Sequence, residues 1–358
     1  MKTYPKANPI IVPVGCSNDS SHSSHSNHVV LPDGVSIVRE SEYDEHMATN
    51  NKLWRDRNVT SGDFTAHDGL SIRYYRTSHK GAAKGCIVIL HGYCGFWGKF
   101  HEMAEYYWRA GYEVFFIEHR GHGYSGRQID GEDLVHVNSY NDYTHDLHQF
   151  MTEIVKPHIG DLKCIMFAHS MGGAIGTLYL EQYQGIFDAA ILSSPMFEIK
   201  TDGTSKLLLN LLLAKIKLLH QEKQPFPGGN PWNGIPTYGK SSAMSELRYM
   251  YIFNQRLVDS HYHTNRMSNG WGYASFRTTP KILKDAHKID IPILLLISGN
   301  DALVDPAGHY RFADSTPNTE FVIYEGAKHE LYNGTDEILE DYYARIFEFI
   351  EKVRRWNS

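Results

Sequence analysis

A serine between small residues is the sharpest chemical signal in the sequence. Ser170 lies in AHSMGG (168–173), directly after the apolar run LKCIMF and before AIGTLYLEQY, which has the composition of a helix. A sharp turn between a strand and a helix exposes the serine hydroxyl and admits only small neighbours. Ala168 replaces the first glycine of the usual GxSxG pattern, and alanine is still small enough. We therefore predict that Ser170 is the nucleophile of an acyl-transfer reaction.

A carboxylate and a histidine follow the serine in the order that such a nucleophile requires. SGNDALVD follows the apolar run PILLLIS, and YEGAKHE follows TEFVIY, so Asp301 and His329 stand at the carboxyl ends of expected strands. Open α/β sheets bind their ligands at that edge. We predict that His329 takes the proton of Ser170 and that Asp301 orients His329. Asp305 is the competing acid, and Asp301 is preferred because it lies nearer the strand end.

Acyl transfer also needs backbone N–H groups that stabilise the developing oxyanion. In this arrangement one comes from the residue after the nucleophile, Met171, and one from the loop after an earlier strand, where HGY points to Tyr93. His91 is a rival base, but it precedes the serine, whereas the expected order is serine, acid, histidine. We expect most other histidines to be structural or to line the substrate pocket, among them His119, His122 and His169.

Short apolar runs separated by helix-length stretches recur along the chain. They lie at 85–93, 112–120, 162–170, 188–194, 292–298 and 319–326. Continuous apolar strands that alternate with helices indicate parallel strands covered on both faces. FTAH and LSIRYYR add a hairpin signal around Asp68-Gly69, and 335–354 predicts a closing amphipathic helix with acids early and bases late. The predicted fold class is α/β, with a mostly parallel, doubly wound sheet.

The alternation of strands and helices is interrupted once, and the interruption predicts the domain organisation. No buried strand is readable in residues 196–285, yet strands resume afterwards. We predict that this stretch is a helical cap, or lid, inserted into a core of residues 60–195 and 286–358. Ordered structure is expected to begin near residue 60, so residues 1–59 are predicted to be an N-terminal extension that is partly disordered.

The overall composition excludes several classes of function. The 358 residues carry a formal charge of -6 and are 42% hydrophobic and 21% charged. No apolar run reaches the roughly 18 residues of a spanning helix, and no basic block indicates nucleic-acid binding. The four cysteines form neither a CxxC pair nor a disulfide framework. We expect no metal or cofactor, because His329-Glu330 lacks the second histidine of HExxH.

The first residues of the chain allow two interpretations. Lysines precede the apolar stretch PIIVPVG and Cys16, and the polar run SNDSSHSSHSNH follows, an order that loosely resembles a lipoprotein signal. The apolar stretch is short for such a signal and contains Pro9 and Pro13. We expect a plain extension on a cytoplasmic or peripherally membrane-associated protein, with lipid anchoring through Cys16 as the alternative.

Five motifs together resemble the monoglyceride lipase and bacterial lysophospholipase group of α/β hydrolases. They are HGY, EHRGHGYSG, AHSMGG, SGNDALVD and YEGAKHE, and the resemblance extends from about residue 60 to the end of the chain. SELRYMYIFNQ and GWGYASFR look more like the bacterial lysophospholipases. The family usually has aspartate where this chain has Glu118, at a structural position. The resemblance implies the α/β-hydrolase fold and hydrolysis of the carboxylic ester of a lipid with one acyl chain.

We therefore predict a lysophospholipase that releases a fatty acid through an acyl-enzyme. A monoacylglycerol lipase or a generic carboxylesterase would use the same catalytic residues, and a non-catalytic binding protein of the same fold is a further alternative.

An apolar segment in the cap bears on the lipid substrate. KLLLNLLLAKIKLL (206–219) predicts a helix with Lys206, Asn210 and Lys217 on one face. This helix either covers an apolar substrate site or rests on a membrane surface, and we predict that Leu208 and Leu212 contact the substrate. The alternative is a helix packed inside the cap.

Overall fold

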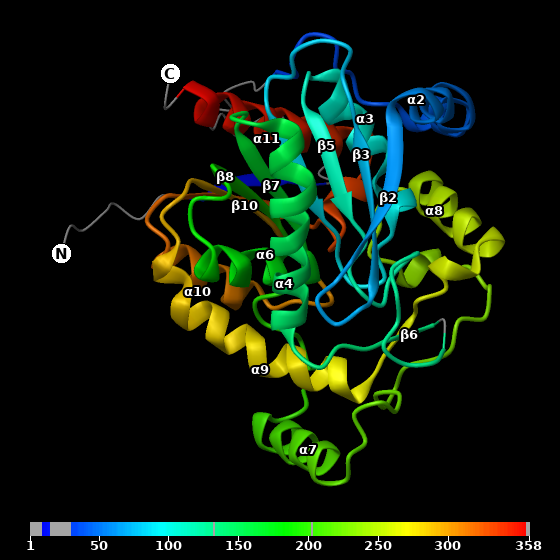
Figure 1. Ribbon diagram of the computed structural model, residues 1–358, viewed down its shortest axis with the longest axis vertical. Helices are drawn as coiled ribbons and strands as arrows, with labels where there is room; N and C mark the ends of the chain where they lie inside the picture. Colours follow the sequence, from blue (N-terminus) through cyan, green and yellow to red (C-terminus); the bar gives the residue numbers. More distant parts are fainter. Residues whose placement is uncertain (1–8, 15–29, 132, 202, 356–358) are drawn as a thin grey trace.

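A nine-stranded sheet runs through the centre of the molecule (Figure 1). The structure, a computed structural model, describes residues 9–14, 30–131, 133–201 and 203–355. The strand order is β1-β11-β10-β8-β7-β4-β5-β3-β2, and neighbours are parallel except in the pairs β2–β3 and β3–β5. The strands are β1 (Ile10–Pro13), β2 (Val59–Thr65), β3 (Ser71–Thr77), β4 (Cys86–Leu90), β5 (Glu113–Ile117), β7 (Cys164–His169), β8 (Ala189–Ser193), β10 (Ile293–Ser298) and β11 (Thr319–Glu325). The predicted α/β class with a mostly parallel sheet is confirmed.

The central strands are apolar on both faces because helices cover both sides of the sheet. Every residue of β4, β7, β8 and β10 is buried. Along β4, Val88 and Leu90 join one core and Ile87 and Ile89 the other, as the two-residue period of a strand requires. The first core is covered by α4 (Tyr140–Phe150), α6 (Met171–Gln182) and α10 (Pro306–Ser315), and the second by α3 (His101–Arg109) and α11 (Asp336–Arg355).

The remaining local expectations for the core match the structure closely. The hairpin signal corresponds to β2 and β3, which pair antiparallel with Thr65 opposite Ser71. The closing amphipathic helix is α11, whose first turn is acidic and whose last turn is basic. Short helical segments complete the core: η3 (Trp97–Phe100), η4 (Met151–Val155), α5 (Lys156–Ile159), η7 (Ala286–Lys288) and η8 (Leu331–Asn333).

Folded structure begins well before residue 60, so that expectation is wrong. The chain forms η1 (Glu40–Glu42), α1 (Tyr43–His46), η2 (Met47–Asn51) and α2 (Lys52–Asn58), and it also adds β1 to the sheet edge beside β11. Met47 and Trp54 are buried in the second core, and the Asn51 amide donates to Glu105 of α3 at 2.7 Å. These tertiary contacts, absent from any local pattern, order the segment. Cys16 lies outside the described residues.

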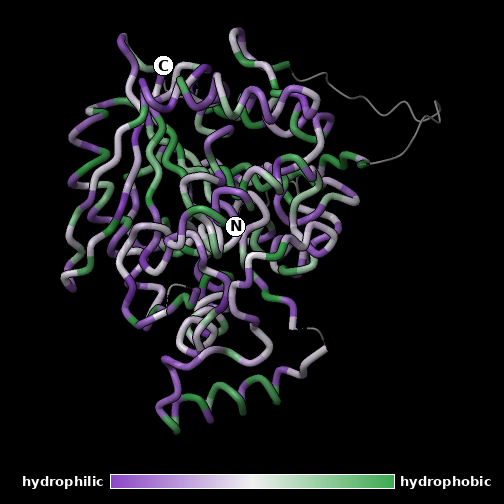
Figure 2. Tube along the Cα trace, turned by 90° about the vertical axis from the view of Figure 1, so that its right-hand side faces the viewer, coloured by the Kyte–Doolittle hydropathy of each residue, from purple (hydrophilic) through white to green (hydrophobic). Residues whose placement is uncertain are grey.

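The region expected to be the cap holds three helices and a short strand. They are α7 (Lys206–Leu218), α8 (Glu246–Val258), α9 (Asn269–Asp285) and β9 (Arg266–Met267), with the turns η5 (Tyr238–Lys240) and η6 (Ser260–Tyr262) between them. β9 pairs with β6 (Leu134–Val135), and α9 packs against α6 and α10 of the core. α7 instead projects from one end of the molecule, where its apolar residues stand out in Figure 2. The boundaries of the cap stay a prediction.

A buried arginine fastens α8 to the core and to the N-terminal segment. Arg248 is fully buried, and its guanidinium donates to the Glu102 carboxylate of α3 at 2.9 and 3.1 Å. It also donates to the carbonyl oxygen of Val38 at 2.7 Å and lies over the ring of Tyr43. Three segments far apart in the sequence are therefore held together by one side chain.

Arg248→Met should lower the free energy of unfolding by about 3–5 kcal/mol, because it leaves the Glu102 carboxylate buried without its partner. Urea unfolding followed by circular dichroism measures this change. Lys52→Met is the matched control, since Lys52 and Asp56 form an exposed ion pair whose loss should leave the unfolding midpoint unchanged. Equal midpoints for wild type and Arg248→Met would contradict the role of this network.

Candidate active site

Ser170 lies on a strained turn between β7 and α6. Its φ of 52° and ψ of -116° are values that residues with a side chain rarely adopt. The turn is also closely packed, since a Cβ on Gly172 would lie 2.3 Å from the carbonyl oxygen of Leu90, and one on Gly173 would lie 2.5 Å from Pro195. The small residues of AHSMGG are therefore required by contacts with neighbouring segments as well as by the turn.

The structure brings Ser170, His329 and Asp301 together in one hydrogen-bonded chain. Nε2 of His329 lies 2.8 Å from Oγ of Ser170, and Nδ1 of His329 lies 2.5 Å from Oδ2 of Asp301. The other carboxylate oxygen of Asp301 accepts from the backbone N–H groups of Leu303 at 2.7 Å and Val304 at 3.0 Å. All three side chains are buried at the carboxyl ends of β7, β10 and β11.

The competing acid, Asp305, makes a different set of contacts. Its side chain caps the N-terminus of α10 by accepting from the N–H of Ala307 at 2.9 Å. Among the hydrogen bonds of the described residues, His329 bonds to Asp301 and not to Asp305. The geometry therefore favours Asp301 as the acid that orients His329.

The protonation states follow from these contacts. Burial alone would raise the pKa of Asp301. Hydrogen bonds from His329 and from two backbone N–H groups together outweigh burial, so the pKa of Asp301 lies below its usual value. Asp301 is therefore an ionised acceptor, and Nδ1 of His329 must be the donor. Nε2 of a neutral His329 is then free to accept the hydroxyl proton of Ser170, as a general base requires.

The two predicted oxyanion donors, Tyr93 and Met171, border Ser170. A Cβ on Gly92 would lie 3.1 Å from Cβ of Ser170, so the loop after β4 passes directly against the serine, and Tyr93 is the next residue. Met171 is the first residue of α6, and such a residue has an N–H outside the helical hydrogen-bond ladder. Helix N-termini also favour negative charge. The arrangement is thus suited to an oxyanion beside Ser170.

The rival base, His91, has both ring nitrogens engaged elsewhere. Nδ1 lies 2.7 Å from the carbonyl oxygen of Gly92, and Nε2 accepts from the N–H of His119 at 2.9 Å. Burial lowers the pKa of His91 well below its usual range and lowers the pKa of His119 and of His122 to about 3. Within the described ranges no group of three or more His, Cys, Asp or Glu side chains is placed to hold a metal ion. The contacts of His91 disfavour it as the base, and a structural or pocket-lining role for His119 and His122 stays a prediction.

His169, predicted to contact the substrate, packs beside the proposed base. Its ring centroid lies 4.8 Å from that of His329, and Nδ1 lies 3.1 Å from the carbonyl oxygen of Ser193. Burial and the neighbouring His329 lower its pKa to about 3. A neutral ring at this position contributes shape and apolar surface to the site, and its contact with substrate stays a prediction.

Glu118 has the structural role expected of it. Its carboxylate accepts from the N–H groups of Trp97 at 3.0 Å and Tyr124 at 2.7 Å. A Cβ on Gly123 would lie 2.2 Å from the Glu118 carboxyl carbon, so the longer glutamate fits only because glycine follows in the turn. Burial raises the pKa of Glu118 to about 7, although the two N–H groups act against that shift.

Two charged residues beside His329 were missed by the sequence analysis. Glu330 forms an ion pair with Lys99, which follows β4, with 2.6 Å between Nζ and Oε1. The second oxygen of Glu330 accepts from the Asn333 amide at 2.7 Å. The only local signal was that Glu330 directly follows His329, because its partner Lys99 lies 231 residues away.

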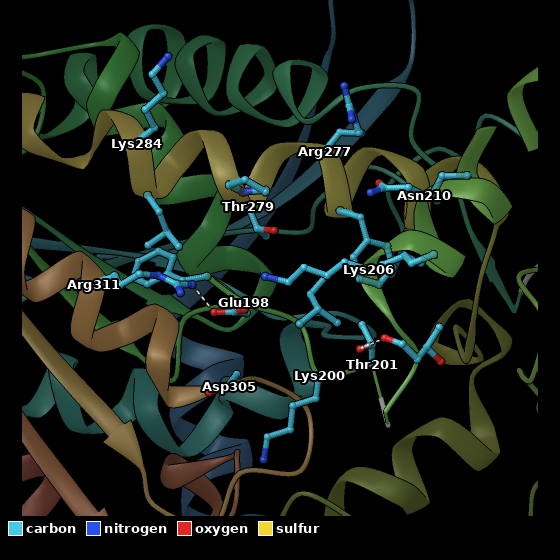
Figure 3. A pocket seen from close by; sticks show the side chains of 18 of the residues that line it. Glu198, Lys200, Thr201, Lys206, Asn210, Arg277, Thr279, Lys284, Asp305 and Arg311 are labelled. Carbon is cyan, nitrogen blue, oxygen red and sulfur yellow. Dashed lines mark hydrogen bonds and ion pairs between the residues drawn. The ribbon is translucent and has the colours of Figure 1, made fainter.

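The two leucines predicted to bind substrate do not line the cavity under α7. This cavity of about 890 Å³ is bounded by α7, α9, α10 and the chain after Phe197, and its α7 lining includes Lys206, Asn210, Leu209 and Leu213 (Figure 3). Leu208 is 59% exposed and Leu212 is partly buried. α7 packs through Leu213 and Ile216, and it turns Leu209 and Asn210 to the cavity in place of Leu208 and Leu212. Contact of Leu208 and Leu212 with a substrate stays a prediction.

Ser170, His329 and Asp301 are not among the residues that line this cavity. It touches their surroundings through Lys200, whose ammonium group donates to the backbone carbonyl of Asp301. Figure 3 shows Arg277 and Lys284 at its rim pointing away from it.

Comparison with known proteins places the chain in a family. The model of the family described as "Serine aminopeptidase, S33" matches residues 81–336. Lysophospholipase L2 of Escherichia coli K12 is 30% identical over 73% of this chain and 76% of its own length. Monoacylglycerol lipase of Mycolicibacterium smegmatis is 26% identical over 72% of this chain and 85% of its own length. The chain belongs to this family of serine hydrolases.

Solved structures support the same fold. A carboxyl esterase from Bacillus coagulans in complex with glycerol matches with a TM-score of 0.66 and 18% identity, covering 83% of this chain and 99% of that protein. A soluble variant of monoglyceride lipase from Saccharomyces cerevisiae matches with a TM-score of 0.64 and 18% identity, covering 82% and 94%. At this identity the likeness concerns the fold alone, which is that of the α/β hydrolases.

Asp301→Asn should lower kcat by about 10³–10⁴-fold, because an amide cannot hold His329 in the tautomer that accepts the serine proton. Asp305→Asn is a matched control, since asparagine caps a helix as well as aspartate does, and its kcat should stay within about twofold of wild type. Steady-state hydrolysis of a p-nitrophenyl ester measures both. The reverse ranking would identify Asp305 as the functional acid.

Proposed function

We propose that the protein is a lysophospholipase that releases a fatty acid from a lipid with one acyl chain. The observation that carries this proposal is the hydrogen-bonded chain from Ser170 through His329 to Asp301, in a member of a serine hydrolase family. The description of the family names a peptidase, whereas the curated relatives are named as lipid-ester hydrolases. Family membership therefore supports the mechanism, and the relatives support the ester substrate.

The proposed reaction passes through an acyl-enzyme. Oγ of Ser170 attacks the ester carbonyl carbon while Nε2 of His329 takes its proton, and Asp301 stabilises the resulting imidazolium. The N–H groups of Tyr93 and Met171 donate to the oxyanion of the tetrahedral intermediate. His329 then protonates the leaving glycerol oxygen. Water attacks the carbonyl carbon of the acyl-enzyme while His329 takes its proton, and His329 returns this proton to Oγ of Ser170 as the fatty acid leaves. A monoacylglycerol lipase or a carboxylesterase would use the same steps, and these two activities are the alternatives.

We also propose that α7 makes peripheral contact with a membrane. Several of its leucines face solvent: Leu207 is 71% exposed, Leu211 59% and Leu218 79%. Lys215 lies in the last turn, where it can meet anionic lipid head groups. No described helix is both long and apolar enough to cross a membrane. A lipase that rests on the bilayer surface through α7 would meet its single-chain substrate there.

Ser170→Ala should reduce hydrolysis by about 10⁴–10⁶-fold without changing the melting temperature, because only the oxyanion hole and substrate binding then contribute to rate. The measurement is turnover of lysophosphatidylcholine, lysophosphatidylethanolamine, monoacylglycerol and p-nitrophenyl butyrate by both proteins. The proposal expects wild type to prefer a lysophospholipid. A preference for monoacylglycerol would shift the assignment to the alternative, and no loss in Ser170→Ala would remove Ser170 as nucleophile.

The double variant Leu207→Ser/Leu211→Ser should bind lipid vesicles at least about 10-fold more weakly than wild type, because two apolar side chains no longer enter the bilayer. Cosedimentation with vesicles containing anionic lipid measures the affinity. Leu53→Ser/Leu257→Ser is the matched control, since these leucines are 48% and 50% exposed on α2 and α8. Equal binding by the two double variants would contradict a membrane role for α7.

A further inference from the structure

A second, smaller cavity lies between α8, the loop after β4 and Glu330. Its volume is about 150 Å³, where a single water needs about 10–15 Å³. Its polar lining includes Cys94, Lys99, Ser241, Arg256 and Glu330. Glu330 directly follows the proposed base His329, and Cys94 directly follows the proposed oxyanion donor Tyr93. Ser170, Asp301 and His329 do not line the cavity, but the residues that directly follow Tyr93 and His329 do, so we expect it to lie within reach of the head group of an ester held at Ser170.

The charges that line the small cavity do not balance. Lys99 and Glu330 neutralise each other through their 2.6 Å ion pair. Arg256 has no such partner, since none of the ion pairs formed by the described residues includes it. The cavity therefore carries one positive charge without an ion-pair partner, on a partly buried side chain, and a partly buried charge is favoured by an accompanying anion.

Neutral groups hold the Arg256 guanidinium in place and leave part of it unused. Nε donates to the carbonyl oxygen of Tyr262 at 3.0 Å, and Nη2 donates to that of Thr264 at 2.8 Å. The guanidinium lies 3.8 Å over the ring of Trp232. Nη1 has no hydrogen bond within the described part of the chain. Burial lowers the pKa of Arg256, which fits a cation held away from water without a carboxylate.

A second polar group in the lining also lacks a partner. The hydroxyl oxygen of Ser241 is buried and has no hydrogen-bond partner among the described residues. Buried polar groups are normally satisfied, and an exception calls for a ligand or another explanation. Ser241 and Arg256 border the same cavity, so both can donate to one anion placed there.

We propose that this cavity binds the phosphodiester of a lysophospholipid head group, with Arg256 as the residue that selects it over an uncharged glycerol. The proposal rests on the proposed lysophospholipase function and specifies its head-group subsite. A phosphodiester carries one negative charge, which matches the one uncompensated positive charge of the cavity. Arginine presents planar N–H donors that suit phosphate oxygens. A monoacylglycerol offers no anion and would leave Arg256 without a partner.

The test compares two substrates with the same acyl chain, palmitoyl lysophosphatidylglycerol and 1-palmitoylglycerol. Arg256→Met should lower the ratio of their kcat/KM values by about 10- to 100-fold, the range for a hydrogen bond to a charged group. Arg256→Lys keeps the charge but not the planar donors, so its ratio of kcat/KM values should lie between those of wild type and Arg256→Met. Arg277→Met is the matched control, because Arg277 lines the other cavity, and it should leave the ratio unchanged.

A ratio unchanged in Arg256→Met, or an equal loss on both lipids, would overturn the proposal and leave Arg256 a structural residue. Should this variant not fold, the wild-type enzyme still decides. Glycerophosphoglycerol should competitively inhibit hydrolysis of p-nitrophenyl butyrate at concentrations where glycerol does not, and equal inhibition by both would contradict the subsite. An enzyme that hydrolyses the nitrophenyl ester but neither lipid would instead refute the proposed lysophospholipase function, and the inhibition experiment would still report on the phosphate site.

Discussion

The turn at Ser170 is the constraint on which the rest of the site depends. A residue with a side chain adopts φ of 52° there only because the surrounding structure holds it, with Gly172 against the Leu90 carbonyl and Gly173 against Pro195. This turn lifts the hydroxyl above the sheet edge at the end of β7. The ends of β10 and β11 then supply Asp301 and His329 at the same edge, because parallel strands end together.

Two charged networks join segments that are far apart in the sequence. Arg248 joins α8 to α3 and to the chain at Val38, while the Lys99–Glu330 pair lies between the loop after β4 and the residue after His329. α8 is thus fixed to the core, whereas α7 packs mainly through Leu213 and Ile216. Residues 196–285 therefore have two parts: α8, which an ion pair fixes to the core, and α7, whose leucines are largely exposed.

The sequence predicted what is decided locally. Apolar runs located the six central strands, and small residues beside a serine located the turn at Ser170, because both requirements act over a few neighbouring positions. Helices over residues 40–58 could not be predicted, since Met47 and Trp54 are buried by contacts with distant segments. The orientation of α7 stayed open for the same reason: its periodicity shows two faces, but only the tertiary structure shows that Leu213 and Ile216 turn inward. The place of Arg256 could not be predicted either, because its contact with Trp232 and the cavity that it lines with Ser241 form only in the folded chain.

Covalent labelling tests the central claim most directly. The wild-type protein would be treated with a long-chain fluorophosphonate, digested and analysed by peptide mass spectrometry. A serine nucleophile activated by His329 predicts one phosphonyl group per chain, on the peptide that contains Ser170, and protection by lysophospholipid. An adduct on another residue, or no adduct in a protein that still hydrolyses lysophospholipid, would contradict the assignment of Ser170.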